Sequence, residues 1–205
     1  MADKTGDSNV FGKHGGFEKL LSYQVAELLE DITKRFVVRY VEPGSRTKDQ
    51  MVQASRSGAS NIAEGSVFSA TSKKLELNLT NVARASLVEL KKDYAAFLRQ
   101  NRLAQWPLND AIRQDLINRR FKEVDAVARW GAGVHKRAPE RSHGEIAGNI
   151  GFVYCMVAIG LLDRQLVTLA RDFEQNGGFS ERLYKARKQH RDQPPKPEPP
   201  EEHAA

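Results

Sequence analysis

Apolar residues that recur every three or four positions constrain this chain more than any other feature of its sequence. Between positions 17 and 36 these residues are Phe17, Leu20, Leu21, Val25, Leu28, Leu29, Ile32 and Phe36. Such spacing places them on one face of a helix, which is then buried. Almost no stretch alternates with the period of two that a half-buried strand requires. The sequence therefore predicts an all-α protein whose first helix ends at Pro43-Gly44.

A second helix is predicted from just after Thr47, whose hydroxyl would cap free amides while Gln50 reaches back to it, and it is expected to end at Glu64-Gly65. The inner face of this helix is built from small residues. They are Ala54, Ser55, Gly58 and Ala59. Little side-chain bulk lets a neighbouring backbone come close, so this segment predicts tight helix pairing.

Three further helices are expected along the chain. The third begins near Ser72 and continues past Leu98, and Trp106-Pro107 breaks the chain after it because proline disfavours a helical residue before it. A fourth helix is expected through apolar positions spaced at helical intervals, namely Ile112, Leu116, Phe121, Val124 and Ala128. A loop is expected to open at Gly131 and Gly133, and the last helix covers about 145–175 before Asn176-Gly177-Gly178.

The two ends of the chain differ in composition from its centre. Residues 1–16 contain no sustained apolar run and are predicted to be a flexible leader rather than a secretory signal. Residues 17–178 form the predicted bundle, and 179–191 a short basic helix. Residues 192–205 are rich in Pro and Glu, cannot bury apolar area, and are predicted to be disordered.

One segment is apolar enough to raise the question of a membrane. From Ile146 to Leu162 the chain has no charged residue over 17 positions, at the lower limit of the roughly 17–25 residues of a spanning helix. Asn149 interrupts this run and Asp163-Arg164 follows directly, which favours a buried bundle helix over a membrane span. The single cysteine, Cys155, fits a reducing compartment. We therefore expect a cytoplasmic protein without membrane association.

The chain is basic, with a formal net charge of +6. A basic surface concentrates polyanions, and Lys and Arg that neutralise phosphates give affinity that does not depend on base sequence. The candidate phosphate contacts are Lys34, Arg35, Arg39, Lys73, Lys74, Lys91, Lys92, Arg99, Arg119, Arg120, Lys136, Arg137, Arg141, Lys185, Arg187 and Lys188. Any single cluster is more typical of a solvated face, but their number favours nucleic acid. A protein-protein interaction scaffold without nucleic acid is the alternative.

The sequence contains no pattern typical of a catalytic or metal site. Its five histidines are scattered, and neither a Cys-x-x-Cys nor a His-Glu-x-x-His spacing occurs. No Ser/His/Asp or Cys/His arrangement can be defended from sequence alone. We therefore expect a protein that is not an enzyme and that uses no cofactor and no metal.

Three segments together resemble a known family. They are 17–20 (Phe-Glu-Lys-Leu), 53–65 (Gln-Ala-Ser-Arg-Ser-Gly-Ala-Ser-Asn-Ile-Ala-Glu-Gly) and 83–90 (Ala-Arg-Ala-Ser-Leu-Val-Glu-Leu). Their order and spacing are similar to the four-helix-bundle proteins of ribosomal RNA intervening sequences, a family that includes the accessory variability protein of diversity-generating retroelements. The resemblance extends over about 17–102. Relative to short family members 107–144 is an insertion, and the chain resembles an extended variant with a C-terminal suffix.

The resemblance implies an antiparallel four-helix bundle, often assembled as a ring of five subunits with a basic surface. It also implies RNA as a partner, with a reverse transcriptase as a possible protein partner, and it implies no enzymatic activity. A non-catalytic, oligomeric RNA-binding or ribonucleoprotein-assembly protein is therefore our leading hypothesis.

Five residues of the shared segments are expected to have structural roles. Gly65 closes the predicted second helix, so Glu64 would sit at a helix C-terminus, where the partial negative charge disfavours a carboxylate. Arg84 or Arg56 is expected to compensate through an ion pair, while Asn61 satisfies nearby backbone groups.

Overall fold

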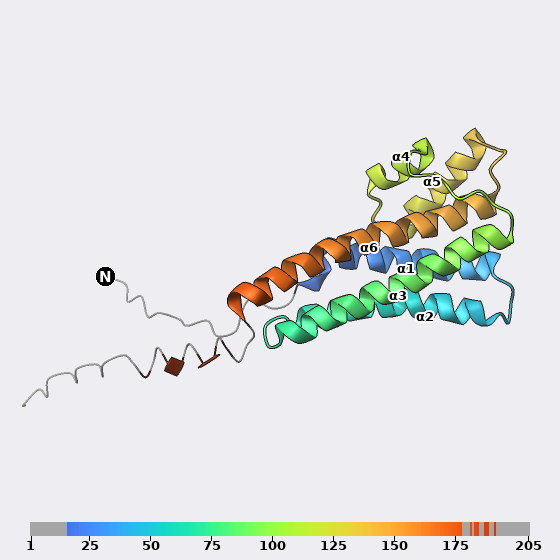
Figure 1. Ribbon diagram of the computed structural model, residues 1–205. Helices are drawn as coiled ribbons and strands as arrows, with labels where there is room; N and C mark the ends of the chain where they lie inside the picture. Colours follow the sequence, from blue (N-terminus) through green and yellow to red (C-terminus); the bar gives the residue numbers. More distant parts are fainter. Residues whose placement is uncertain (1–15, 178–180, 182, 185–186, 189–190, 192–205) are drawn as a thin grey trace, which may run out of the picture.

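Four long helices form an antiparallel bundle, and this confirms the all-α prediction (Figure 1). The computed structural model describes residues 16–177 together with 181, 183–184, 187–188 and 191. Within this part of the chain it has no strand. The bundle helices are α1 (Leu21–Tyr40), α2 (Arg46–Phe68), α3 (Lys73–Gln100) and α6 (His143–Asn176), and the 3-10 turn η1 (Phe17–Lys19) precedes α1. Helix α2 packs on α1 and α3, and α6 closes the bundle against α3 and α1.

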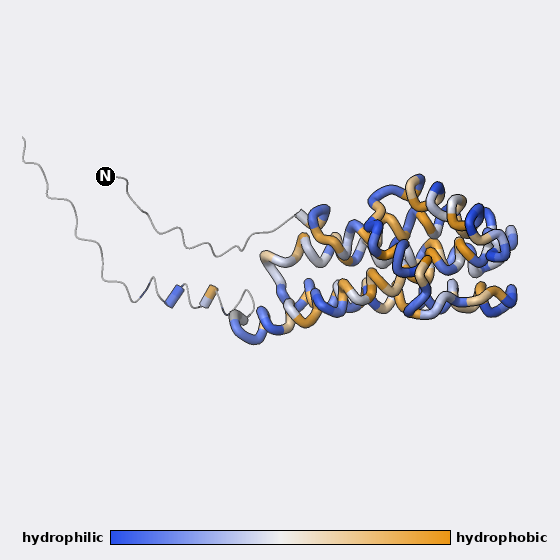
Figure 2. Tube along the Cα trace, turned by 90° about the horizontal axis from the view of Figure 1, so that it is seen from above, coloured by the Kyte–Doolittle hydropathy of each residue, from blue (hydrophilic) through white to orange (hydrophobic). Residues whose placement is uncertain are grey.

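The insertion adds two short helices that cover one end of α6. They are α4 (Ala111–Arg119) and α5 (Val124–Arg137), and both pack mainly on α6 (Figure 1). Apolar positions line the sides of the helices that face one another (Figure 2). The predicted leader 1–15 and tail 192–205 lie outside the described residues, as do several positions of the predicted basic helix 179–191. The described residues from 181 to 191 are helical.

The starts predicted for α3 near Ser72 and for α6 near Glu145 agree with the structure, where a serine caps each helix. The Oγ of Ser72 accepts a hydrogen bond from the Leu75 N–H at 3.2 Å, and the Oγ of Ser142 accepts one from Glu145 at 3.1 Å. Thr47 was wrong as the cap of α2, because Ser45 takes that position and accepts from the Thr47 N–H at 3.3 Å.

The predicted end of α2 at Glu64-Gly65 is also wrong, since the helix continues to Phe68. Gly65 does not adopt the left-handed conformation of a helix-ending glycine. It is buried against α3, where a Cβ atom would lie 3.4 Å from both the Glu76 carbonyl oxygen and the Leu79 Cβ. This glycine therefore serves close approach rather than termination. The same holds for Gly58, which faces Leu87, so the tight pairing predicted for α2 is confirmed.

The single helix expected through positions 112–128 is wrong, because the chain breaks between α4 and α5. Arg120 adopts a left-handed conformation with φ of 48° and ends α4. The loop predicted to open at Gly131 and Gly133 is wrong as well, since both glycines lie within α5. Gly131 is buried where α5 approaches Ile146 and Ile150 of α6, and the loop follows at 138–142.

Helix α6 is the apolar segment that raised the question of a membrane. By length and composition, His143–Gln175 is the one helix of the described residues that could cross a bilayer, and the mean hydropathy of its most apolar 18-residue window is 1.7. However, 61% of its most apolar window is buried within the bundle. Its hydrophobic side chains therefore serve as the central packing surface of the fold.

Candidate nucleic-acid interface

Two of the predicted phosphate contacts are held by carboxylates on their own helices. The Lys34 Nζ lies 2.8 Å from Glu30 and 3.6 Å from Asp31, and the Glu30 hydrogen bond raises the pKa of Lys34. Arg119 lies 2.9 Å from Asp115. These pairs are exposed and contribute little to stability. They also partly neutralise the two cations as contacts for phosphate.

Two other predicted contacts join separate helices. Arg35 of α1 contacts Asp125 of α5 at 2.6 Å. The Lys73 Nζ, at the start of α3, lies 3.1 Å from Glu76 and 3.3 Å from Asp172 of α6. Burial raises the pKa of Glu76 despite the opposing effect of the Lys73 ammonium. Arg35 and Lys73 therefore act first as links between helices.

Arg141 is the most thoroughly engaged of the predicted contacts. Its guanidinium lies 3.0 Å from Asp110 and 3.7 Å from Glu145, and it sits 5.6 Å from the centroid of the Trp106 ring. Burial raises the pKa of Asp110, but hydrogen bonds from the Arg113 N–H and from Arg141 outweigh it and hold that pKa below its ordinary value. Arg141 thus anchors the segment before α4 rather than facing solvent freely.

The remaining predicted contacts make no ion pair with any described residue. They are Arg39, Lys74, Lys91, Lys92, Arg99, Arg120, Lys136, Arg137, Arg187 and Lys188. All are exposed except Lys91, which is half-buried. Lys185 lies outside the described residues. No carboxylate of the described residues pairs with these side chains, so they are the better candidates for phosphate contacts.

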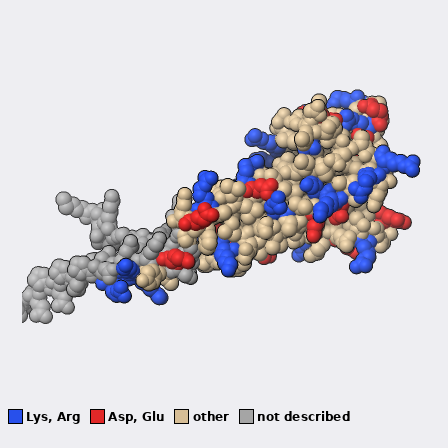
Figure 3. Space-filling model, in the orientation of Figure 1, with Lys and Arg blue, Asp and Glu red and all other residues tan. Residues whose placement is uncertain are grey.

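Several of these cations gather at one end of the bundle, which we call the cationic end. It is the end that carries the connections 41–45, 101–110 and 138–142 (Figure 1). Its cations without an ion pair to any described residue are Arg39, Arg46, Lys48, Arg99, Arg102, Lys136 and Arg137. Figure 3 shows Lys and Arg side chains over this end, with fewer acidic side chains among them. The cationic end combines residues from α1, α2, α3 and α5.

A layer of aromatic rings holds the helices together beneath the cationic end. The ring centroid of Phe97 on α3 lies 4.8 Å from that of Phe36 and 6.2 Å from that of Tyr40, both on α1. A Cβ atom at Gly144, in the first turn of α6, would lie 3.8 Å from Phe97. These rings pack α1 against α3 beneath the cationic end, with the first turn of α6 beside Phe97.

Asn149 fixes the 101–110 connection on α6. Its Oδ1 accepts a hydrogen bond from the Trp106 N–H at 2.8 Å, and its Nδ2 donates to the carbonyls of Ala104 and Glu145 at 2.8 and 2.9 Å. The side chain is fully buried. A polar residue in an apolar run is therefore explained by backbone groups that it satisfies.

The ion pair expected for Glu64 is wrong. Because α2 continues beyond it, Glu64 lies inside the helix, exposed and without an ion pair among the described residues. Arg84 instead pairs with Asp163 of α6, and Arg56 is exposed. Asn61 does satisfy a backbone group as expected, because its Nδ2 donates to the Ser57 carbonyl at 2.8 Å.

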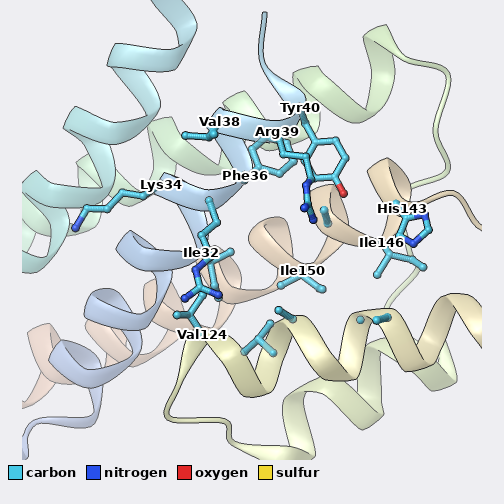
Figure 4. Close-up of a pocket in the computed structure, with 16 residues that line it drawn as sticks. Ile32, Lys34, Phe36, Val38, Arg39, Tyr40, Val124, His143, Ile146 and Ile150 are labelled. Atoms are coloured by element: carbon cyan, nitrogen blue, oxygen red, sulfur yellow. The ribbon is translucent and has the colours of Figure 1, made fainter. Parts of the chain in front are cut away.

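A cavity of about 640 Å³ adjoins the cationic end, between α1, α5 and α6. We call it the α1–α5–α6 pocket (Figure 4). Its wall is largely apolar, and its charged or titratable lining residues are Lys34, Arg35, Arg39, Tyr40 and His143. Sequence reasoning did not find it. The small residues Ala128, Gly131 and Ala132 on one side of α5 are the only local signal.

Comparison with known proteins identifies no relative. No protein-family model, no curated protein and no solved structure matches this chain. Among the described residues, no group of three or more His, Cys, Asp or Glu side chains is placed to hold a metal ion.

Proposed function

We propose that this protein binds RNA or another nucleic acid without catalysis, through the cationic end of the bundle. One observation carries the proposal: cations from four helices lie together at this end without ion pairs to described residues. By contrast, Arg35, Lys73 and Arg84, which lie along the sides of the bundle, each pair with a carboxylate of another helix. Glu42, Asp49 and Glu140 lie at the same end but are fewer. Binding of phosphates by such cations releases counterions, so it is electrostatic and tolerant of sequence.

Binding to single-stranded RNA should depend steeply on salt. If about five phosphates are engaged, the slope of log affinity against log salt should be about 3.5 to 4.5 in magnitude. The triple variant Arg46→Gln, Arg99→Gln, Arg102→Gln removes three exposed, unpaired cations of the cationic end. It should weaken binding at every RNA sequence and lower the slope by about two.

A charge-matched control separates local contacts from net charge. The variant Lys19→Gln, Arg164→Gln, Arg171→Gln removes three exposed cations from the opposite half of the bundle, none of them a candidate phosphate contact. It should leave affinity and slope close to those of the unchanged protein. Equal loss in both variants, or no RNA binding at low salt, would contradict the proposal.

The proposal extends to assembly in the cytoplasm, with a homo-oligomer, a pentamer by preference, and a reverse transcriptase as a possible partner. The family resemblance supports these points. Light scattering combined with analysis of nucleic acid that copurifies with the protein tests assembly and RNA binding together. A monomer that copurifies with nucleic acid would contradict the proposed oligomer but not the proposed RNA binding.

A protein-protein interaction scaffold is the second candidate function. It is favoured by large hydrophobic side chains left exposed on α2 and α3, where Val67 is 55%, Phe68 40% and Val82 48% accessible. Purification without nuclease that recovers bound proteins and no nucleic acid would favour the scaffold over the RNA-binding role.

A further inference from the structure

We propose that the α1–α5–α6 pocket is a binding site for a small amphipathic anion, a single-chain molecule with an apolar body and a carboxylate or phosphate head. The site adjoins the proposed RNA interface and shares Arg39 with it, while the cations of α3 do not line the pocket. Three observations carry the assignment: the size of the pocket, the apolar character of its wall, and one arginine at its rim without an ion pair.

The size of the pocket suits a small molecule. Its volume of about 640 Å³ lies within the roughly 300–1,000 Å³ typical of ligand pockets. Gly131 of α5 lies on the wall of the pocket, where α5 approaches α6 closely. A Cβ at Gly131 would meet the Ile150 Cδ1 at 3.4 Å and the Ile146 Cγ2 at 3.6 Å. The two helices touch there, and α1 completes the enclosure beside them.

The wall of the pocket is apolar and partly open to solvent. Val127, Ile146 and Ile150 form its buried floor, whereas the apolar lining residues that meet solvent are Val38, which is 74% exposed, Ala128 and Ala132. Covering this exposed part of the wall with the apolar body of a ligand would remove it from water, which is the main driving force for such binding. The wall by itself would favour any hydrophobic ligand.

The charges at the rim select an anionic head. Lys34 is paired with Glu30 and Asp31, and Arg35 with Asp125. Arg39 lines the same pocket and makes no ion pair with a described residue. Figure 4 shows its guanidinium extending toward the side where Ile150 and His143 lie, while Lys34 points away.

Arg39 therefore offers a planar, permanently charged donor beside an apolar wall. A guanidinium forms bidentate hydrogen bonds with carboxylate and phosphate groups. The lining residues include no Asp or Glu that would repel such a head. An anion held by Arg39 would leave its apolar body over Ile146 and Ile150.

Calorimetry with ten-carbon probes, in the absence of nucleic acid, tests the assignment. Decanoate below its micellar concentration should bind with one molecule per chain, more tightly than 1-decanol or decyltrimethylammonium. Arg39→Gln should weaken decanoate at least about tenfold, since it removes a charge-assisted contact, and should leave 1-decanol unchanged. Ala132→Trp, which changes an exposed lining residue, should abolish binding of both.

Two controls keep the test specific. Arg99→Gln removes an unpaired cation of the same end and Ala85→Trp adds the same bulk on α3, and neither residue lines the pocket. Both should bind decanoate as the unchanged protein does, and circular dichroism should show all four variants folded. Equal affinity of decanoate for the Arg39→Gln variant would overturn the proposal.

Two other results would also overturn it by giving the pocket another occupant. If Ala132→Trp changes the number of subunits in light scattering, the surface is covered by a second copy of the chain. If the protein binds vesicles of phosphatidylglycerol but not monomeric decanoate, the surface contacts a membrane instead of a soluble ligand.

Discussion

Two buried tyrosines differ in whether their hydroxyls have a partner. The Tyr94 hydroxyl lies 3.0 Å from the Thr33 Oγ1, which itself donates to the Leu29 carbonyl, so Tyr94 is the donor. The Tyr154 hydroxyl is buried without a hydrogen-bond partner among the described residues, and burial raises the pKa of Tyr154 to about 12. The two phenols therefore contribute to stability in different ways.

Replacement of each tyrosine by phenylalanine should show this difference. Tyr94→Phe removes a made hydrogen bond and should lower the free energy of unfolding by about 1 kcal/mol. Tyr154→Phe removes a hydroxyl that gains nothing from its site and should leave that free energy unchanged or higher. Urea unfolding of both variants measures the difference, and an equal loss in the two would show that Tyr154 has a partner after all.

Single residues also show where sequence reasoning stops. The interruption at Asn149 could be seen in the sequence, but its partners Ala104 and Trp106 lie more than 40 positions away and required the fold. The same holds for Arg84, whose partner Asp163 is 79 positions distant. The local choice of Glu64 as a partner failed because it assumed a helix end that does not exist.

At the scale of helices, the helix ends that depend on nearby residues could be predicted from the sequence. The start of α3 at Ser72 and the extent of α6 follow from the serine caps and from Gly177, all of which act within a few residues. The break between α4 and α5 was missed because an arginine, Arg120, adopts the left-handed conformation there. Gly65 and Gly131 were misassigned because their role is contact with another helix.

Two glycines of α6 should therefore respond in opposite ways to alanine. A Cβ atom at Gly160 would meet nothing within 4 Å, whereas one at Gly151 would overlap the buried ring of Tyr94. Gly160→Ala should raise the free energy of unfolding by about 0.5–1 kcal/mol through helix propensity. Gly151→Ala should lower it, because overpacking costs about 1–3 kcal/mol and exceeds that gain. Thermal or urea unfolding decides the signs, and stabilisation by both would refute the packing seen here.

At the scale of the molecule, α4 and α5 are attached less extensively than the four bundle helices are to one another. The pairs α2–α3 and α3–α6 share long seams, while α4 and α5 contact mainly the first half of α6. The bundle class could be predicted from periodicity, but the position of α4 and α5 could not. Nothing in a single sequence says on which helices an insertion packs. The α1–α5–α6 pocket depends on that position and was missed with it.

Loss of the Asn149 side chain should loosen α4 and α5 before it loosens the bundle. Asn149→Ala would leave the buried Trp106 N–H without its partner, at a cost of about 1–3 kcal/mol, and would also free the Ala104 carbonyl, which belongs to an exposed residue and can bind water instead. Hydrogen exchange should then rise in 101–110, α4 and α5, since local opening follows the weakest attachment. The amides of α2 and the first half of α3 should keep their protection. Uniform acceleration across all helices would instead show that α4, α5 and the bundle unfold as one unit.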